Sequence, residues 1–254
     1  HITIKCKMLL TNYSSKFSKK QLILLSIPVF FSNLAIPLVG MVDTGLMGNL
    51  GETKYLASMS IATTVMTMVI VSFGFLRSGT VGIVSQAYGR SDYRDIVKTL
   101  LRNFMISLFI SLIILALMPL IKILVHQLFA SSDETKFLVN KYLNVRVFSI
   151  PAELIIYILI GFYLGIQKTK ISSSMIILMS VLNILFSTIL VLSFNLNVVG
   201  VALGTLISSY ITAFIFVIYT KFFIIKKFQV IPKFENLLIK SKLLKLFRIN
   251  LDIF

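Results

Sequence analysis

The sequence is poor in charged residues, in histidine and in cysteine. Only 13% of its 254 residues are charged, whereas soluble domains carry about a quarter. A lone cysteine, Cys6, excludes a disulfide framework within one chain. The two histidines, His1 and His126, belong to no zinc signature, and neither a phosphate-binding glycine loop nor an acid–base pair at a recognisable spacing is present. We therefore expect no enzyme, and an intramembrane enzyme is the least favoured alternative.

What the sequence has in abundance is apolar residues. They make up 57% of the chain, and the mean hydropathy is +0.95. Six apolar runs are long enough to cross a bilayer, which takes about 20 helical residues, and none shows the period-two alternation of a barrel strand. We expect an all-α integral membrane protein whose immediate partner is the lipid bilayer. The six runs are Gln21–Met47, Ala57–Ala87, Thr99–Met118, Phe137–Leu164, Ile171–Phe194 and Val199–Thr220.

Basic residues lie mainly on one side of these runs. The formal net charge is +16, and 19 of the 25 Lys and Arg residues lie in the N-terminal tail, the even-numbered gaps and the segment after the sixth run, against four in the odd-numbered gaps. The positive-inside rule then predicts a cytoplasmic N-terminus. Because these charges occupy short gaps between apolar runs, we expect them to contact lipid headgroups and not nucleic acid.

This pattern predicts four segments. A cytoplasmic tail (1–20) precedes a six-helix transmembrane lobe (21–220), a basic linker (221–246) follows, and a seventh helix begins at 247–254. We expect the linker to lie along anionic headgroups, and a specific lipid or partner site is the alternative. Met8 is the first plausible start, and the sequence stops as an apolar run opens, so we expect both ends to be truncated.

Only two acidic residues, Asp43 and Glu153, lie well inside the apolar runs. A charge in hydrocarbon costs at least about 2.5–3.5 kcal/mol, so such residues usually serve a function or have a partner. Asp43 is the first candidate for ion coupling, with pairing to an arginine as the structural alternative. Glu153 is the second candidate, with pairing to a buried arginine as the structural alternative. Arg146 lies on the same helix face but about 10 Å away along the axis, so the two need not touch.

A polar pocket is predicted opposite Asp43. With 1.5 Å of rise per residue, Asp43, Asn183, Ser187 and Thr205 all lie roughly 12–18 Å from the outer edge of the membrane. Two purely structural alternatives remain open. Asn183 could form a hydrogen bond that only holds two helices together, and Thr205 could bond back to its own helix.

Three further features concern helix shape and packing. Pro28 and Pro37 interrupt the hydrogen-bond ladder of the first run and permit a bend. Arg77 is expected near the cytoplasmic end of the second run, where its side chain can reach the headgroups. Small residues at four-residue spacing in the sixth run predict close helix packing. These are Gly200, Gly204 and Ser208.

Several motifs resemble the multidrug and toxic compound extrusion (MATE) family, and within it the branch of DNA-damage-inducible protein F. The strongest is IPLVGMVDTGLMGNLG at Ile36–Gly51, in the first run. The others follow the order of that family's helices. They are Phe75–Arg77, Ser85–Gly89, Pro151–Ala152, Gly161, Gly165–Gln167, Asn195–Thr205 and Ile249–Ile253.

The resemblance implies twelve helices in two six-helix lobes in the bacterial inner membrane, exchanging protons or sodium for small organic cations by alternating access. This chain would supply the first lobe, and its missing partner would be the C-terminal six-helix lobe. No cofactor beyond the coupling ion is implied. By the family's pattern Asp43 matches the ion-coupling aspartate, Pro28 the proline of the bent helix, and Asn183 and Thr205 the pocket. Ser187 differs from the family's pattern, because the family commonly has a second aspartate at this position.

Alternatives to the antiporter remain. One is a lipid-linked oligosaccharide flippase of the same superfamily, whose cavity would carry several cationic side chains. Another is a non-transporting membrane remnant, which Ser187 and the truncation both allow. Within the antiporter, either Asp43 acts alone or Glu153 supplies the missing carboxylate. The depths of Glu153 and Ser187 differ, which favours Asp43 alone.

Overall fold

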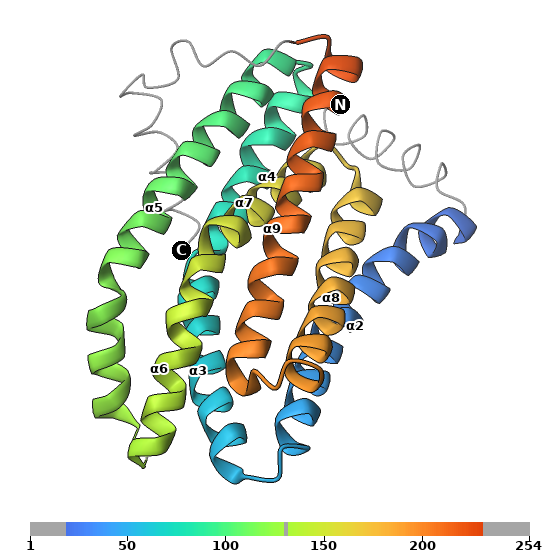
Figure 1. Ribbon diagram of the computed structural model, residues 1–254. Coiled ribbons are helices and arrows are strands. Elements are labelled where there is room, and N and C mark those ends of the chain that lie inside the picture. The colour runs from blue at the N-terminus through green and yellow to red at the C-terminus, as the bar shows by residue number, and fades with distance from the viewer. Residues whose placement is uncertain (1–18, 130–131, 231–254) are drawn as a thin grey trace, which may run out of the picture.

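The structure is a computed structural model that describes residues 19–129 and 132–230, with side chains from Ser26 onward. Throughout this part of the chain the regular structure is helical (Figure 1). The predicted tail up to residue 18, the linker from residue 231 and the start of a seventh helix lie outside the described residues.

The described residues form six candidate membrane spans, which confirms the predicted number and the all-α class. Successive spans run up and down, and their connections alternate between the two ends of the bundle (Figure 1). Two spans consist of two consecutive helices each. The helices are α2 (Lys19–Gly48), α3 (Thr53–Ser72), α4 (Gly74–Gly89), α5 (Tyr93–Leu128), α6 (Asp133–Arg146), α7 (Ile150–Gly165), α8 (Thr169–Leu192) and α9 (Asn197–Phe223).

The break between α6 and α7 has a local cause. A short 3-10 turn, Val147–Ser149, joins them, and Pro151 follows at the start of α7. Proline has no backbone N–H and its ring clashes with the carbonyl of residue 147 in a regular α-helix, so the chain tightens there. The second break lies at Phe73, whose N–H bonds to the carbonyl of Ile70 at 3.0 Å. This break makes Arg77 part of the first turn of α4.

The first span contains both predicted prolines within one helix. Pro28 and Pro37 lie inside α2, which continues from Lys19 to Gly48 without interruption. The cost of proline in a helix interior is a lost donor and a displaced carbonyl, and a membrane helix can absorb both by local adjustment.

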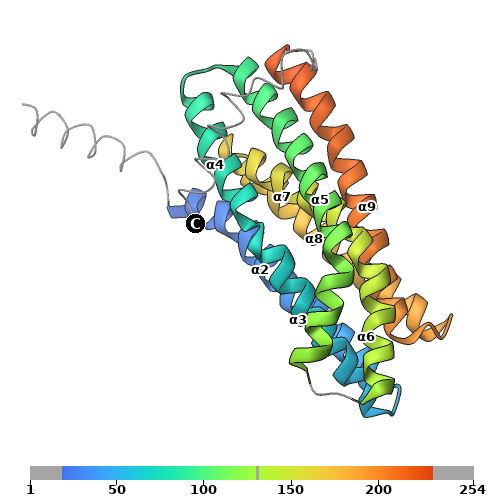
Figure 2. The same cartoon turned by 90° about the vertical axis from the view of Figure 1, so that its left-hand side faces the viewer.

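The span made of α6 and α7 forms the centre of the bundle. Its most apolar window is 72% buried, against 17% for α2 and 28% for α5. Helix α7 contacts α4, α5, α8 and α9, and it lies behind α9 and between α4 and α8 in Figure 1. The view in Figure 2 shows α5 and α9 on one side of the bundle and α2 on the other. Side chains of α7 are therefore fixed by packing on several sides.

Small residues bring α8 and α9 into close approach, which confirms the predicted packing role of the glycine ridge. A Cβ added to Gly204 would lie 2.3 Å from Ser187 Oγ, and one added to Gly200 would lie 2.9 Å from Val191 Cγ2. The third member, Ser208, is fully buried. This contact sets the distance between the two helices that carry the predicted pocket residues.

The end of the sixth span differs from the predicted boundary. Helix α9 runs to Phe223, and a π-helical turn, Ile224–Phe228, extends it. The Phe228 ring stacks on Tyr93 with 4.6 Å between centroids. This aromatic contact holds the first described residues of the expected linker against the start of α5.

Candidate functional site

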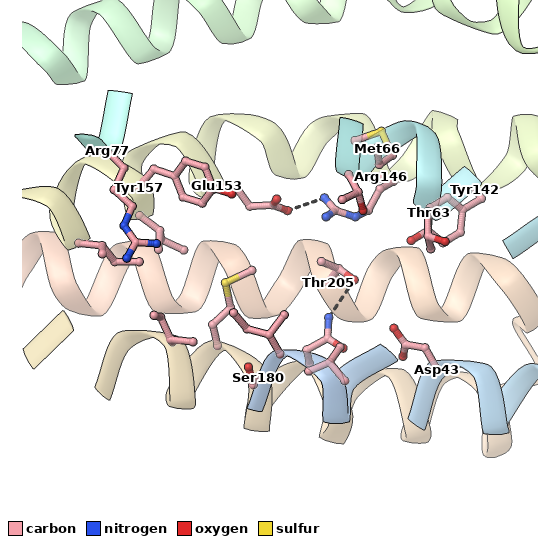
Figure 3. Close-up of a pocket in the computed structure, with 18 residues that line it drawn as sticks. Asp43, Thr63, Met66, Arg77, Tyr142, Arg146, Glu153, Tyr157, Ser180 and Thr205 are labelled. Atoms are coloured by element: carbon pink, nitrogen blue, oxygen red, sulfur yellow. Dashed lines mark hydrogen bonds and ion pairs between the residues drawn. The ribbon is translucent and has the colours of Figure 1, made fainter. Parts of the chain in front are cut away.

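A cavity of about 360 Å³ lies inside the bundle. Its lining comes from α2, α3, α4, α6, α7, α8 and α9, and combines apolar side chains and two tyrosines with nine other polar or charged residues (Figure 3). This combination of size and lining is typical of sites for small organic molecules.

Asp43 lies at one end of the cavity, on α2 (Figure 3). Its side chain is buried, and its Oδ1 has no hydrogen-bond partner among the described residues. Ser187 lies beside the carboxylate, and Arg146 is near enough to act on it electrostatically. No basic group of the described residues comes within ion-pair distance of Asp43, so the arginine-paired alternative is absent from this part of the chain.

The other predicted pocket residues form one hydrogen-bonded group beside Asp43. Asn183 Nδ2 donates to Thr205 Oγ1 at 2.8 Å, and Ser187 Oγ donates to Asn183 Oδ1 at 3.4 Å. Thr205 Oγ1 also donates to the carbonyl of Val201 at 3.1 Å. Both structural alternatives therefore occur within the predicted pocket: Asn183 bonds between helices, and Thr205 bonds back to its own helix. The structure brings Asp43, Asn183 and Thr205 to the cavity surface, whereas Ser187 is fully buried and is not part of the lining.

Arg146 and Glu153 are in contact, so the arginine-paired alternative for Glu153 holds, although the axial separation did not require it. They form a buried ion pair, and Arg146 also bonds Ser149. Ser209 Oγ of α9 lies 3.5 Å from Glu153 Oε1, and its closer acceptor is the carbonyl of Thr205 at 2.7 Å. The separation along the axis was overestimated for the side chains, because a long guanidinium arm spans the tightened turn between α6 and α7. The carboxylate of Glu153 thus has partners, and that of Asp43 retains an open oxygen.

Arg77 also departs from its predicted position. Its side chain lines the cavity at the end opposite Asp43 (Figure 3), whereas the sequence suggested a place near the headgroups. It belongs to the first turn of α4, which continues to Gly89, so the membrane-spanning segment extends well beyond it. The turn at Phe73 directs the side chain inward, a feature that hydropathy does not report.

Sequence reasoning missed several polar contributors. Tyr142, Tyr157, Thr63 and Thr67 line the cavity, and Ser209 lies near Glu153. Tyr142 lies one helical turn before Arg146 and Tyr157 one turn after Glu153, so the four-residue spacing was the available signal. Ser209 had none, because its contact joins helices far apart in the sequence.

The site can bind a cation or hold a proton at a single buried carboxylate. In the described ranges, no group of three His, Cys, Asp or Glu side chains could hold a metal ion. An apolar wall beside one open carboxylate oxygen suits a monovalent organic cation or a proton.

Two comparisons of sequence identify relatives. The MatE family model matches residues 28–189. DNA damage-inducible protein F of Escherichia coli is 32% identical over 84% of this chain and 46% of its own length. Multidrug export protein MepA of Staphylococcus saprophyticus is 28% identical over 76% of this chain and 43% of its own length. The chain thus spans less than half the length of these relatives.

Solved structures share the fold. A transporter of the MOP superfamily from Pyrococcus furiosus superposes with a TM-score of 0.79 at 22% identity, over 89% of this chain and 50% of that one. An outward-facing multidrug resistance MATE transporter gives the same TM-score, identity and coverage.

The family assignment rests on the sequence match, and the structural similarity supports the fold. The family model covers more than half of the chain, including the first five spans almost completely. The chain is a multi-pass membrane protein that belongs to the MatE family.

Proposed function

We propose that this chain is one lobe of a cation-coupled antiporter that exports organic cations by alternating access, with Asp43 as the coupling site. It works together with a second six-helix lobe, in a bacterial inner membrane, with its N-terminus cytoplasmic. The coupling ion is a proton, with sodium as the alternative. The observation that carries this proposal is the open oxygen of a buried carboxylate at the wall of a cavity.

The chemistry follows from the cost of burying a charge. A buried carboxylate that lacks an ion-pair partner is stabilised by a proton, a metal cation or an organic cation. Only one of these can occupy the single open position at a time. If the proton is released when the organic cation binds, and the reverse happens in the other conformation, the two ions cross the membrane in opposite directions.

The contacts of Glu153 favour coupling through Asp43 alone. Glu153 is held by Arg146 and Ser209, so protonating it would leave a buried guanidinium without its counter-charge. Ser187, which stands where the family commonly has an aspartate, cannot supply a second proton-carrying group. The coupling unit is therefore one carboxylate.

The flippase alternative needs several cationic side chains in the cavity. Two arginines line it, Arg77 and Arg146. The charge of Arg146 is balanced by Glu153, which leaves a single uncompensated cation. This charge pattern favours a cationic substrate near Asp43 over a lipid-linked diphosphate.

The first experiment tests the need for a second lobe. In proteoliposomes with an imposed proton gradient, the 254-residue chain alone should give no ethidium flux, because alternating access needs the second lobe. A fusion to the second half of the Escherichia coli relative should restore flux. Flux from the chain alone would contradict the two-lobe proposal, and a correctly inserted fusion without flux would favour the remnant.

The second experiment tests Asp43 in that fusion. Asp43→Asn should abolish ethidium resistance in cells that lack their own efflux pumps, at unchanged membrane abundance. Asp95→Asn, on a half-buried carboxylate near the start of α5, is the matched control and should keep resistance. Full resistance in the Asp43→Asn variant would make Asp43 structural.

A further inference from the structure

Arg77 is the only charged cavity residue besides Asp43 that lacks an ion-pair partner among the described residues. Its side chain is exposed and faces the cavity next to Tyr157 (Figure 3). The nearest acidic residue along that wall, Glu153, is already engaged by Arg146. The guanidinium is therefore free to bind an anionic group that enters the cavity.

The backbone at Arg77 is fixed, although its side chain is exposed. A Cβ added to Gly161 of α7 would lie 2.6 Å from the carbonyl oxygen of Arg77 and 2.9 Å from Thr80 Cβ. Helix α4 is thus held tightly against the central helix α7 at this point. The guanidinium projects from a rigid element, which lowers the entropy lost when a ligand binds.

The two uncompensated charges lie at opposite ends of the cavity (Figure 3). Arg146, on the Asp43 side, and Tyr157, on the Arg77 side, are eleven residues apart in sequence, which corresponds to about 16 Å of helix rise. Between the ends the wall includes the apolar Ile156 and Met179 together with Glu153, whose charge is balanced by Arg146. An elongated molecule can touch both charges while its body contacts this wall.

We infer that the cavity binds amphoteric molecules, with the cationic group at Asp43 and a carboxylate or similar anionic group at Arg77. This inference rests on the proposed function and refines its substrate class. A planar carboxylate matches the donor geometry of a guanidinium. A molecule with only a cationic group uses one end of the cavity and leaves Arg77 unpaired.

The test compares two dyes that differ in one group. One is a fluorescent acridinium dye with a carboxylate on a butyl tail, and the other is its methyl ester. Each is titrated, with anisotropy as the readout, into the purified 254-residue chain in an uncharged maltoside detergent. The free acid should bind about tenfold more tightly than the ester, as expected for a charge-assisted hydrogen bond in a sheltered site.

Three variants test whether Arg77 causes the preference for the free acid over the ester. Arg77→Gln should weaken binding of the free acid to the level of the ester, and Arg77→Lys should keep part of the difference. Arg94→Gln removes the same charge at an exposed position outside the cavity, and this variant should keep the full difference in affinity between acid and ester. A thermal melt of each variant checks folding. Equal affinities in the unmodified chain, or a preference that survives Arg77→Gln, would overturn the inference.

A further variant separates this inference from the proposed function. Asp43→Asn should weaken both dyes, because both carry the cationic group. If Asp43→Asn weakens both while the unmodified chain binds them equally, the function stands and the role of Arg77 is wrong. If Asp43→Asn weakens neither, the cation site at Asp43 is wrong, and so is the two-ended site that depends on it.

Discussion

The two cavity carboxylates lie on helices with opposite surroundings. Asp43 belongs to α2, whose most apolar window is 17% buried, and Glu153 to the α6–α7 span, where the value is 72%. Glu153 meets Arg146 and Ser209, whereas Asp43 retains an open oxygen. The central carboxylate has a permanent partner, and one oxygen of the peripheral carboxylate has none among the described residues.

The difference has a physical reason. Both carboxylates line the same cavity and both are buried, so the difference lies in their neighbours. Glu153 has a guanidinium within ion-pair distance, which a buried charge needs, and Asp43 has no basic side chain there among the described residues. The comparison predicts that changes at Glu153 affect stability, and changes at Asp43 affect binding.

The largest expected effect is loss of one member of the buried pair. Arg146→Gln or Glu153→Gln should each lower the free energy of unfolding by about 3–5 kcal/mol, because each leaves one buried charge unpaired. The double variant should recover much of this loss. Denaturant unfolding of the chain in maltoside micelles, followed by circular dichroism, provides the measurement.

Asp43→Asn sharpens the comparison in the same assay. It removes a buried charge that has no ion-pair partner, so the free energy of unfolding should stay the same or rise, and should not fall. A loss as large as that of Glu153→Gln would mean that Asp43 has a structural partner. In the two-lobe fusion, the double Arg146→Gln/Glu153→Gln variant should keep proton-driven efflux, and its loss in folded protein would contradict coupling through Asp43 alone.

The next effect concerns the contact between α8 and α9. Gly204→Ala should destabilise the chain by about 1–3 kcal/mol, because the added Cβ meets Ser187 Oγ and the backbone behind it. The resulting shift of α8 relative to α9 should also weaken binding of cationic dyes at Asp43. Gly82→Ala is the control, since no neighbouring atom lies within 4 Å of the added Cβ, and it should be neutral or slightly stabilising. Equal effects of the two substitutions would contradict the close approach.

A smaller effect is expected at the hydrogen bond between Asn183 and Thr205. Thr205→Val removes the acceptor of Asn183 Nδ2 and should cost about 1 kcal/mol, the typical range for such bonds in membrane bundles. Thr64→Val is the matched control, because Thr64 is exposed and bonds only to its own helix at Ser60. A control that is as destabilising as Thr205→Val would remove the argument for an interhelical bond.

The smallest effect is expected at an exposed ion pair. Lys54 lies 2.5 Å from Glu52 and 3.2 Å from Glu134, at the end of the bundle. Exposed pairs contribute little, so Lys54→Gln should leave the melting temperature unchanged within error. A clear decrease would show that this contact between α3 and α6 holds the bundle, and the distinction between central and peripheral charges would weaken.

The pocket around Asp43 shows how far depth arguments reach. Rise per residue placed Asn183, Ser187 and Thr205 at one level, and the structure joins them through hydrogen bonds. The same arithmetic failed for Arg146 and Glu153, because it measures backbone separation and ignores the reach of a long side chain. The expected position of Arg77 near the headgroups, which came from its place along the apolar run, was wrong because its side chain lines the cavity.

The sequence by itself determined the six spans, the all-α class and the buried position of Asp43, since each depends on local hydropathy and on the cost of a charge in hydrocarbon. Only the tertiary structure decided which charges have partners. Glu153 is neutralised by Arg146 and supported by Ser209, while Asp43 and Arg77 remain open at the two ends of one cavity. Pairing depends on where helices distant in sequence meet, and no pattern along the chain encodes that contact directly.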